Sequence, residues 1–201
     1  MQRAVLVAIV IAGVVASAGA RAATFDIDPA HTNAEFAVRH LMVSTVRGHL
    51  GKVSGAVQLD ETDVTKSSVT ATIDVTGIET REPKRDEHLR GADFLDVKQY
   101  PTITFKSKEV TKLADDTFIV KGDLTIRGVT KEVTLDVEGS PKPFTDPFGN
   151  VKLGGVARTK INRQDFGVAW SKSLDNGGLV VGNELEITID IELTKKKDEA
   201  K

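Results

Sequence analysis

The chain has 201 residues and a mass of 21.6 kDa, with 27 basic and 29 acidic side chains and a net charge of −2. This length suits one domain or at most two, and it excludes a large multidomain enzyme. The near-neutral charge leaves no electrostatic footprint for nucleic acid. The absence of cysteine excludes disulfides, zinc–thiolate sites and thiol catalysis.

Residues 1–23 have the composition of a secretory signal peptide. Arg3 precedes an apolar run over residues 4–18, and two A-x-A patterns of small residues follow it. The run is shorter than the roughly 20 residues that cross a bilayer. The sequence therefore predicts a cleaved, periplasmic chain that begins between Arg21 and Thr24 and has no stable membrane insertion. Nucleotide cofactors are not normally supplied there, so no cofactor is expected.

From residue 24 onward, apolar and polar residues alternate with the period of two that is typical of antiparallel strands. Two short candidates come first, at Phe36–Val38 and Val43–Leu50. Further segments follow at 53–59, 69–75, 103–105, 118–126, 129–137, 151–161 and 185–193, with a tight turn at Arg127-Gly128. We count about eight strands. An all-β, up-and-down antiparallel barrel is predicted, because closure removes the exposed edges of such strands.

One stretch, residues 80–91, breaks the alternation. Pro83 lies near its start and Gly91 at its end, which is typical of a short helix with a glycine at its C-terminus. Phe94 and Leu95 follow, and we expect them to plug an apolar space.

Two segments rich in Pro, Gly and Asn, at 140–150 and 164–182, are expected to be surface loops at a barrel mouth. The charged residues 195–201 are expected to form a solvated tail. No repeat or linker divides residues 24–194, which we take as one domain.

The sequence contains no recognisable catalytic set. Its four histidines lack the short spacing of metal-ligand motifs, so no metal site is expected. No G-x-S-x-G elbow is present for a nucleophilic serine. The many carboxylates fall on polar strand faces, which lie on the surface by default. No catalytic residue is therefore assigned.

The interior of an eight-stranded barrel is wide enough either to be filled by side chains or to hold one elongated ligand. Small residues in the inward series, namely Gly55, Ala71, Gly122, Gly155 and Ala157, favour a cavity. Glycines also serve bends and bulges, so a packed interior is the alternative. An apolar cavity would suit a lipid tail, since each buried CH₂ contributes roughly 0.8 kcal/mol.

Five blocks of sequence form an ordered series across the domain. They are FDIDPAHTNAEFAVRHLMVSTVRG at 25–48, RDEHLR and ADFLD within 85–96, YPTITFKS at 100–107, GDLTIRGVTK at 122–131 and INRQDFG at 161–167. Together they resemble the YceI-like, polyisoprenoid-binding family over about residues 24–194. The resemblance implies an extended lipocalin-like barrel in the periplasm, whose pore binds a polyisoprenoid or another long-tailed amphiphile. It implies roles in isoprenoid or quinone handling and stress response, and no enzyme activity.

The blocks also carry candidate ligand contacts. Polar and cationic residues at segment ends and in the helix are expected to receive a phosphate or other polar headgroup: Arg39, His40, Arg85, His88, Arg90, Asn162 and Arg163. The alternative is a structural network of Asp86, Arg90, Asn162 and Arg163 that fastens the helix to the barrel. The candidate contacts for the tail are Phe36, Val38, Ile73, Phe105, Phe118, Leu124, Leu135, Phe166 and Trp170, each of which would otherwise be core packing.

The sequence thus predicts an exported soluble carrier whose partner is a long-chain isoprenoid or another amphiphilic lipid. Two alternatives remain open. One is an enzyme acting on such a lipid, with His40 or His88 as acid or base near neutral pH. The other is a packed-barrel structural or stress protein that works through its surface. A homodimer through one outer face is a further expectation.

Overall fold

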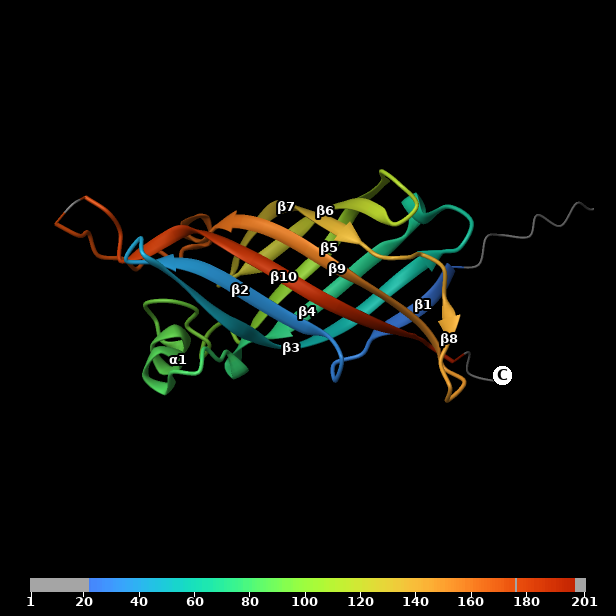
Figure 1. Ribbon diagram of the computed structural model, residues 1–201, viewed down its shortest axis with the longest axis horizontal. Helices are drawn as coiled ribbons and strands as arrows, with labels where there is room; N and C mark the ends of the chain where they lie inside the picture. The colour runs from blue at the N-terminus through green and yellow to red at the C-terminus, as the bar shows by residue number, and fades with distance from the viewer. Residues whose placement is uncertain (1–21, 176, 198–201) are drawn as a thin grey trace, which may run out of the picture.

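The protein is a closed β-barrel, elongated along its axis, as the computed structural model in Figure 1 shows for residues 22–175 and 177–197. Its strands are β1 (Ala22–Ile27), β2 (Asn33–His40), β3 (Ser44–Asp60), β4 (Ser68–Asp74), β5 (Thr102–Lys112), β6 (Thr117–Ile126), β7 (Val129–Glu138), β8 (Phe144–Thr145), β9 (Val151–Asn162) and β10 (Val181–Lys195). One α-helix, α1 (Pro83–Arg90), and three 3₁₀ turns, η1 (Val64–Lys66), η2 (Val75–Gly77) and η3 (Arg163–Phe166), complete the described elements.

Eight strands close the barrel in the order β2, β3, β4, β5, β6, β7, β9, β10 and back to β2, and all of these pairings are antiparallel. Chain order and spatial order therefore agree, as in an up-and-down barrel. The apolar residues of the alternating segments form the core inside the barrel, whereas their polar neighbours face outward. The predicted eight-stranded antiparallel barrel with one short helix is confirmed.

The first two strands occupy one position in the barrel wall. β1 pairs with β3 and with β10, through Phe25↔Val57 and Phe25↔Lys195, and β2 pairs with the same two strands farther along. The chain between them turns at Asp28, whose carboxylate accepts a hydrogen bond from the Ala30 N–H at 3.0 Å. β1 and β2 are thus a single interrupted strand, and β1 was not among the predicted strands.

The two predicted strands at 43–50 and 53–59 are wrong as separate elements, because β3 runs unbroken through both. Glycines let this long strand coil around the barrel. Gly51 and Gly55 have φ values of 133° and 139°, and a Cβ on Gly55 would lie 2.1 Å from the carbonyl oxygen of Thr70. The short strand β8 lies within the segment predicted as a loop at 140–150.

The helix predicted within 80–91 is confirmed as α1. Glu82 caps its N-terminus by accepting from the Lys84 N–H at 3.3 Å, Pro83 is its first residue, and the Gly91 N–H donates to the His88 carbonyl at 3.0 Å. The helix lies beside the end of the barrel where β2 turns into β3 (Figure 1).

The ends of the chain bear on two predictions. The signal peptide falls on residues 1–21, outside the described residues, and Ala22 already pairs with Asp60 in the barrel. Lys195, the first residue of the predicted tail, belongs to β10, and its Nζ lies 3.2 Å from Glu61 Oε1. In the described part of the chain, no helix has the length and apolar character needed to cross a membrane.

Candidate functional site

The barrel encloses two cavities of about 220 Å³ each. The mouth cavity lies at the α1 end and is lined in part by Arg85, His88 and Leu89 of that helix. The inner cavity occupies the rest of the barrel. Leu50, Ile103 and Ile187 line both, so the two cavities meet end to end along the barrel axis. Together they fall within the roughly 300–1,000 Å³ of ordinary ligand sites.

All nine residues predicted to contact a tail line one of these cavities. Phe36, Val38, Phe166 and Trp170 line the mouth cavity, and Ile73, Phe105, Phe118, Leu124 and Leu135 line the inner cavity. The inner cavity has no charged lining residue within the described chain. Its surface is suited to an apolar tail and to little else.

The predicted headgroup residues divide into two groups. Five of them line the mouth cavity, namely Arg39, His40, Arg85, His88 and Arg163. Arg90 and Asn162 do not line it. Arg90 donates to the Ile78 carbonyl at 3.1 Å, and the Asn162 side chain caps η3 by accepting from the Gln164 N–H at 3.0 Å. Both side chains therefore bond to the backbone outside the cavity lining.

The predicted network of four residues forms two separate sets. Asp86 is buried and accepts hydrogen bonds from the Thr80 N–H at 2.8 Å and from the Thr80 hydroxyl. Asp86 and Arg90 thus bind the segment before the helix, whereas Asn162 and Arg163 organise η3 and the start of β10. The helix is therefore held mainly by its own flanking chain.

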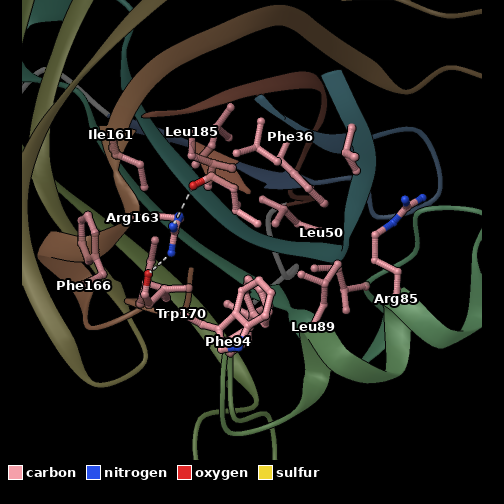
Figure 2. A pocket seen from close by; sticks show the side chains of 18 of the residues that line it. Phe36, Leu50, Arg85, Leu89, Phe94, Ile161, Arg163, Phe166, Trp170 and Leu185 are labelled. Carbon is pink, nitrogen blue, oxygen red and sulfur yellow. Dashed lines mark hydrogen bonds between the residues drawn. The ribbon is translucent and has the colours of Figure 1, made fainter. Parts of the chain in front are cut away.

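Arg163 is the principal charged group of the mouth cavity (Figure 2). It is only 4% exposed. Its Nε donates to the Gly182 carbonyl at 2.8 Å, one terminal nitrogen donates to the Val168 carbonyl, and the other donates to the Val181 carbonyl at 3.2 Å. These partners are neutral, and burial lowers the pKa of the guanidinium without neutralising it. Among the described residues, Arg163 therefore brings a positive charge to the cavity wall without an acidic partner.

The α1 side of the mouth combines a second cation with an aromatic cluster. Arg85 donates from Nε to the Thr80 hydroxyl at 2.7 Å and from a terminal nitrogen to the Thr80 carbonyl at 2.9 Å. The His88 ring meets Phe94 and Trp170 edge-on, with centroids 4.9 and 5.1 Å apart. The expected apolar plug is thus part of the mouth, since Phe94 lines the cavity there.

The small residues predicted to open the interior behave in two ways. Ala71, Gly155 and Ala157 line the inner cavity. Gly55 and Gly122 do not, because both are needed for close approach. A Cβ on Gly122 would lie 2.6 Å from the Phe105 ring. These two glycines shape the wall rather than leave space inside it.

Sequence reasoning missed the junction of the cavities. Leu50, Ile103 and Ile187 all lie within predicted strands. The alternation signals that such residues face inward. Only the strand register brings them to the same level of the barrel.

Residues 25–193 match the model of the YceI-like domain family. The chain belongs to the YceI-like family. A UPF0312 protein of Staphylococcus aureus (strain N315) is 35% identical over 170 residues, which cover 85% of this chain and 96% of that protein.

Solved structures of YceI-like proteins share the barrel. The YCEI protein of Campylobacter jejuni matches with a TM-score of 0.67 and 30% identity, over 79% of this chain and 90% of that one. BcnA of Burkholderia cenocepacia matches with a TM-score of 0.69 and 24% identity, over 83% and 98%. A polyisoprenoid binding domain from Saccharophagus degradans matches with a TM-score of 0.62 and 12% identity, over 87% and 99%. The last two likenesses concern the fold alone.

Proposed function

We propose that this YceI-like protein is a carrier that binds one long-tailed amphiphile inside its barrel, with a polyisoprenoid as the favoured tail. The observation that carries the proposal is the division of the interior. The inner cavity has no charged lining residue among those described, whereas the mouth cavity that adjoins it has several. A ligand with an apolar tail and a polar head fits this gradient in one orientation, with its tail inward.

The buried Arg163 favours an anionic headgroup. In the part of the chain that the structure describes, its hydrogen-bond partners are neutral oxygens, and Arg85 lines the same cavity. A phosphate or carboxylate placed beside Arg163 would gain charge-assisted hydrogen bonds in a poorly solvated site. The polyisoprenoid binding domain from Saccharophagus degradans has the same fold, which supports the choice of tail.

No step of chemistry is part of this proposal. His88 is held between two aromatic rings and bonds Asp93 Oδ2 at 2.8 Å through Nε2. These contacts fix the orientation of the imidazole, which forms part of the lining of the mouth cavity. A fully packed barrel is disfavoured by the two cavities.

Export to the periplasm belongs to the same proposal and rests on the composition of residues 1–23. Cleavage after Ala20 would leave the Ala22↔Asp60 pair intact, whereas cleavage after Ala22 would remove it. We expect the former. Cell fractionation with N-terminal sequencing of the full chain tests this, and an uncleaved cytoplasmic product would refute it. The homodimer and a stress role remain predictions. Light scattering, which measures the molar mass in solution, tests the homodimer.

The binding test uses a pair of variants on one strand. Ala71 lines the inner cavity, and its neighbour Thr70 is exposed on the outer face of β4. Ala71→Phe should lower the affinity for a fluorescent prenyl phosphate by roughly tenfold or more, because the ring displaces several methylenes of the tail. Thr70→Phe should bind as the wild type does.

Mass spectrometry of an organic extract, from protein purified without detergent, should show the natural ligand at near one-to-one stoichiometry. Equal binding by the two phenylalanine variants would place the ligand outside the barrel and overturn the proposal. An empty extract together with no uptake of the prenyl probe would favour the surface-acting alternative.

A further inference from the structure

The hairpin between β2 and β3 ends in three consecutive exposed apolar residues. Leu41 is 39% exposed, Met42 60% and Val43 79%. We call this segment the apolar tip. Single exposed apolar residues are common on protein surfaces, but a run of three at the end of a hairpin is not expected from folding alone.

The backbone of the apolar tip is also strained. Leu41 and Met42 have φ values of 50° and 62°, and the Val43 N–H donates to the His40 carbonyl at 3.1 Å. This is the pattern of a type I′ turn, whose two central residues are left-handed and which strongly prefers Asn-Gly; Val43 is one extra residue between that turn and the His40↔Ser44 pair. Leu41 and Met42 therefore lower the stability of the fold in two ways, through their left-handed backbone conformation and through the exposure of their apolar side chains to water.

The apolar tip lies at the mouth of the barrel. Arg39 and His40, which precede it, line the mouth cavity. The Leu41 N–H donates to the Val180 carbonyl at 2.9 Å, and Val180 also lines that cavity. In Figure 1 the tip and the neighbouring loop before β10 stand at the end of the molecule opposite β8.

The charges around the tip favour an anionic surface. Arg39 is exposed, and its terminal nitrogens donate to the Met42 carbonyl at 2.8 Å and to Thr45 Oγ1 at 3.0 Å. Lys172 is exposed on the adjacent loop, whose Val180 N–H bonds the Lys172 carbonyl at 2.8 Å. Asp175 is the acidic residue of that loop. Cations next to exposed apolar side chains are typical of membrane-surface contacts.

We propose that the apolar tip docks the barrel mouth on the surface of an anionic phospholipid bilayer, with its three side chains in the headgroup region. Three residues are too few for a stable protein interface, which needs about 800 Å² per partner, whereas a bilayer accepts a small apolar wedge flanked by cations. The proposal rests on the proposed function in one respect. A mouth held against the bilayer gives a lipid tail a path into the cavity that avoids water.

The test replaces the tip by the sequence that its backbone prefers. Leu41→Asn combined with Met42→Gly should keep or raise the Tm, because Asn-Gly fits the turn. The same variant should bind mixed vesicles of phosphatidylethanolamine and phosphatidylglycerol roughly tenfold more weakly than the wild type. Phe148→Ser is the matched control, since Phe148 is 87% exposed near β8. It should leave vesicle binding unchanged.

A second readout uses Trp170, the only tryptophan of the chain, which lines the mouth cavity. Brominated phospholipids should quench its fluorescence in the wild type and much less in the Asn-Gly variant. Unchanged vesicle binding by that variant would overturn the proposal. A wild-type protein that does not bind vesicles would overturn it too. This includes the case in which the apolar tip binds a protein partner instead.

The two proposals fail in different ways. The Asn-Gly variant should bind a prenyl phosphate delivered from cyclodextrin as tightly as the wild type does, but should extract it from vesicles more slowly. Vesicle docking without any prenyl binding would refute the carrier and leave the docking tip standing. Prenyl binding without vesicle docking would refute the docking tip and leave the carrier standing.

Discussion

Four charged residues meet where β1 gives way to β2. Lys152 Nζ lies 2.7 Å from Glu192 Oε1 and 3.3 Å from Asp28 Oδ2, and His31 Nδ1 lies 2.9 Å from Asp28 Oδ2. Asp28, His31 and Glu192 are close enough to share a cation, but the Lys152 ammonium already supplies the positive charge. The cluster is best understood as a clamp on the interrupted strand.

The hydrogen bond between His31 and Asp28 shifts both titrations. It lowers the pKa of Asp28 to about 2, with the Ala30 N–H adding to the effect. It raises the pKa of His31 above its ordinary value of 6.5. The histidine contribution to stability is therefore complete below pH 6.5 and is lost as the pH rises through the raised pKa. The aspartate contribution is complete above pH 3.8 and is lost as the pH falls through about 2.

His31→Gln should accordingly lower the free energy of unfolding more at pH 5 than at pH 9. At pH 5, below the ordinary pKa of His31, the wild type has the charged pair, whereas a rise toward pH 9 removes the proton from a growing share of His31. Urea unfolding of both proteins at the two pH values measures the difference. A deficit that is the same at both values would mean that the ring contributes through packing and not through its charge.

At the scale of elements, the weakest part of the wall lies between β7 and β9. Within the described chain these strands share three residue pairs, Asp136–Glu138 with Val156–Arg158, whereas β9 and β10 share eleven. An outer groove of about 810 Å³ follows the seam, and Ile161, Phe166 and Ile187 line both this groove and the mouth cavity. These three side chains thus lie between the interior and the outside there.

Hydrogen exchange should find this seam. The amides of residues 129–134 have a ladder partner only on the β6 side, so we expect them to exchange faster on average than those of the β9–β10 ladder. Mass spectrometry of peptides that cover 129–134 and 184–194 makes the comparison. Equal protection in the two peptides would show that η3 seals the seam as well as a paired strand would.

The sequence predicted most elements because alternation and turn chemistry are local signals. Pro83 and Gly91 marked the helix, and the alternation gave each long segment one apolar side, which lies in the core. Two features escaped. The interruption between β1 and β2 depends on their shared neighbours, β3 and β10, and the continuity of β3 depends on the approach of Gly55 to Thr70. Both are set by strand pairing over long sequence distances.

The same limit applies to the candidate site. The sequence could not separate the roles of adjacent polar residues such as Asn162 and Arg163, of which the first caps a turn and the second reaches the cavity. The alternation with a period of two was enough to find the apolar lining residues, because a residue lines the interior when it lies on the apolar face of its strand. The headgroup residues needed the geometry of loop ends, which has no such period.

At the scale of the whole molecule, ligand capacity follows from closure. Strand pairing consumes the edges of the wall, and the inward side chains leave two cavities end to end. Among the described residues, charged side chains line the mouth cavity and not the inner cavity. The barrel thus has a direction, from a charged mouth at α1 to an apolar interior.

The position of β10 in the wall governs how the chain can be made. β10 pairs with β1, β2 and β9, and it follows all of them in the sequence. A ribosome therefore releases every other strand before the barrel can close, and until then β2 and β9 have open edges beside an uncovered apolar face. Chaperones, or export of the unfolded chain, would have to keep the growing polypeptide from aggregating. The barrel then closes in a single late event, after β10 has been synthesised.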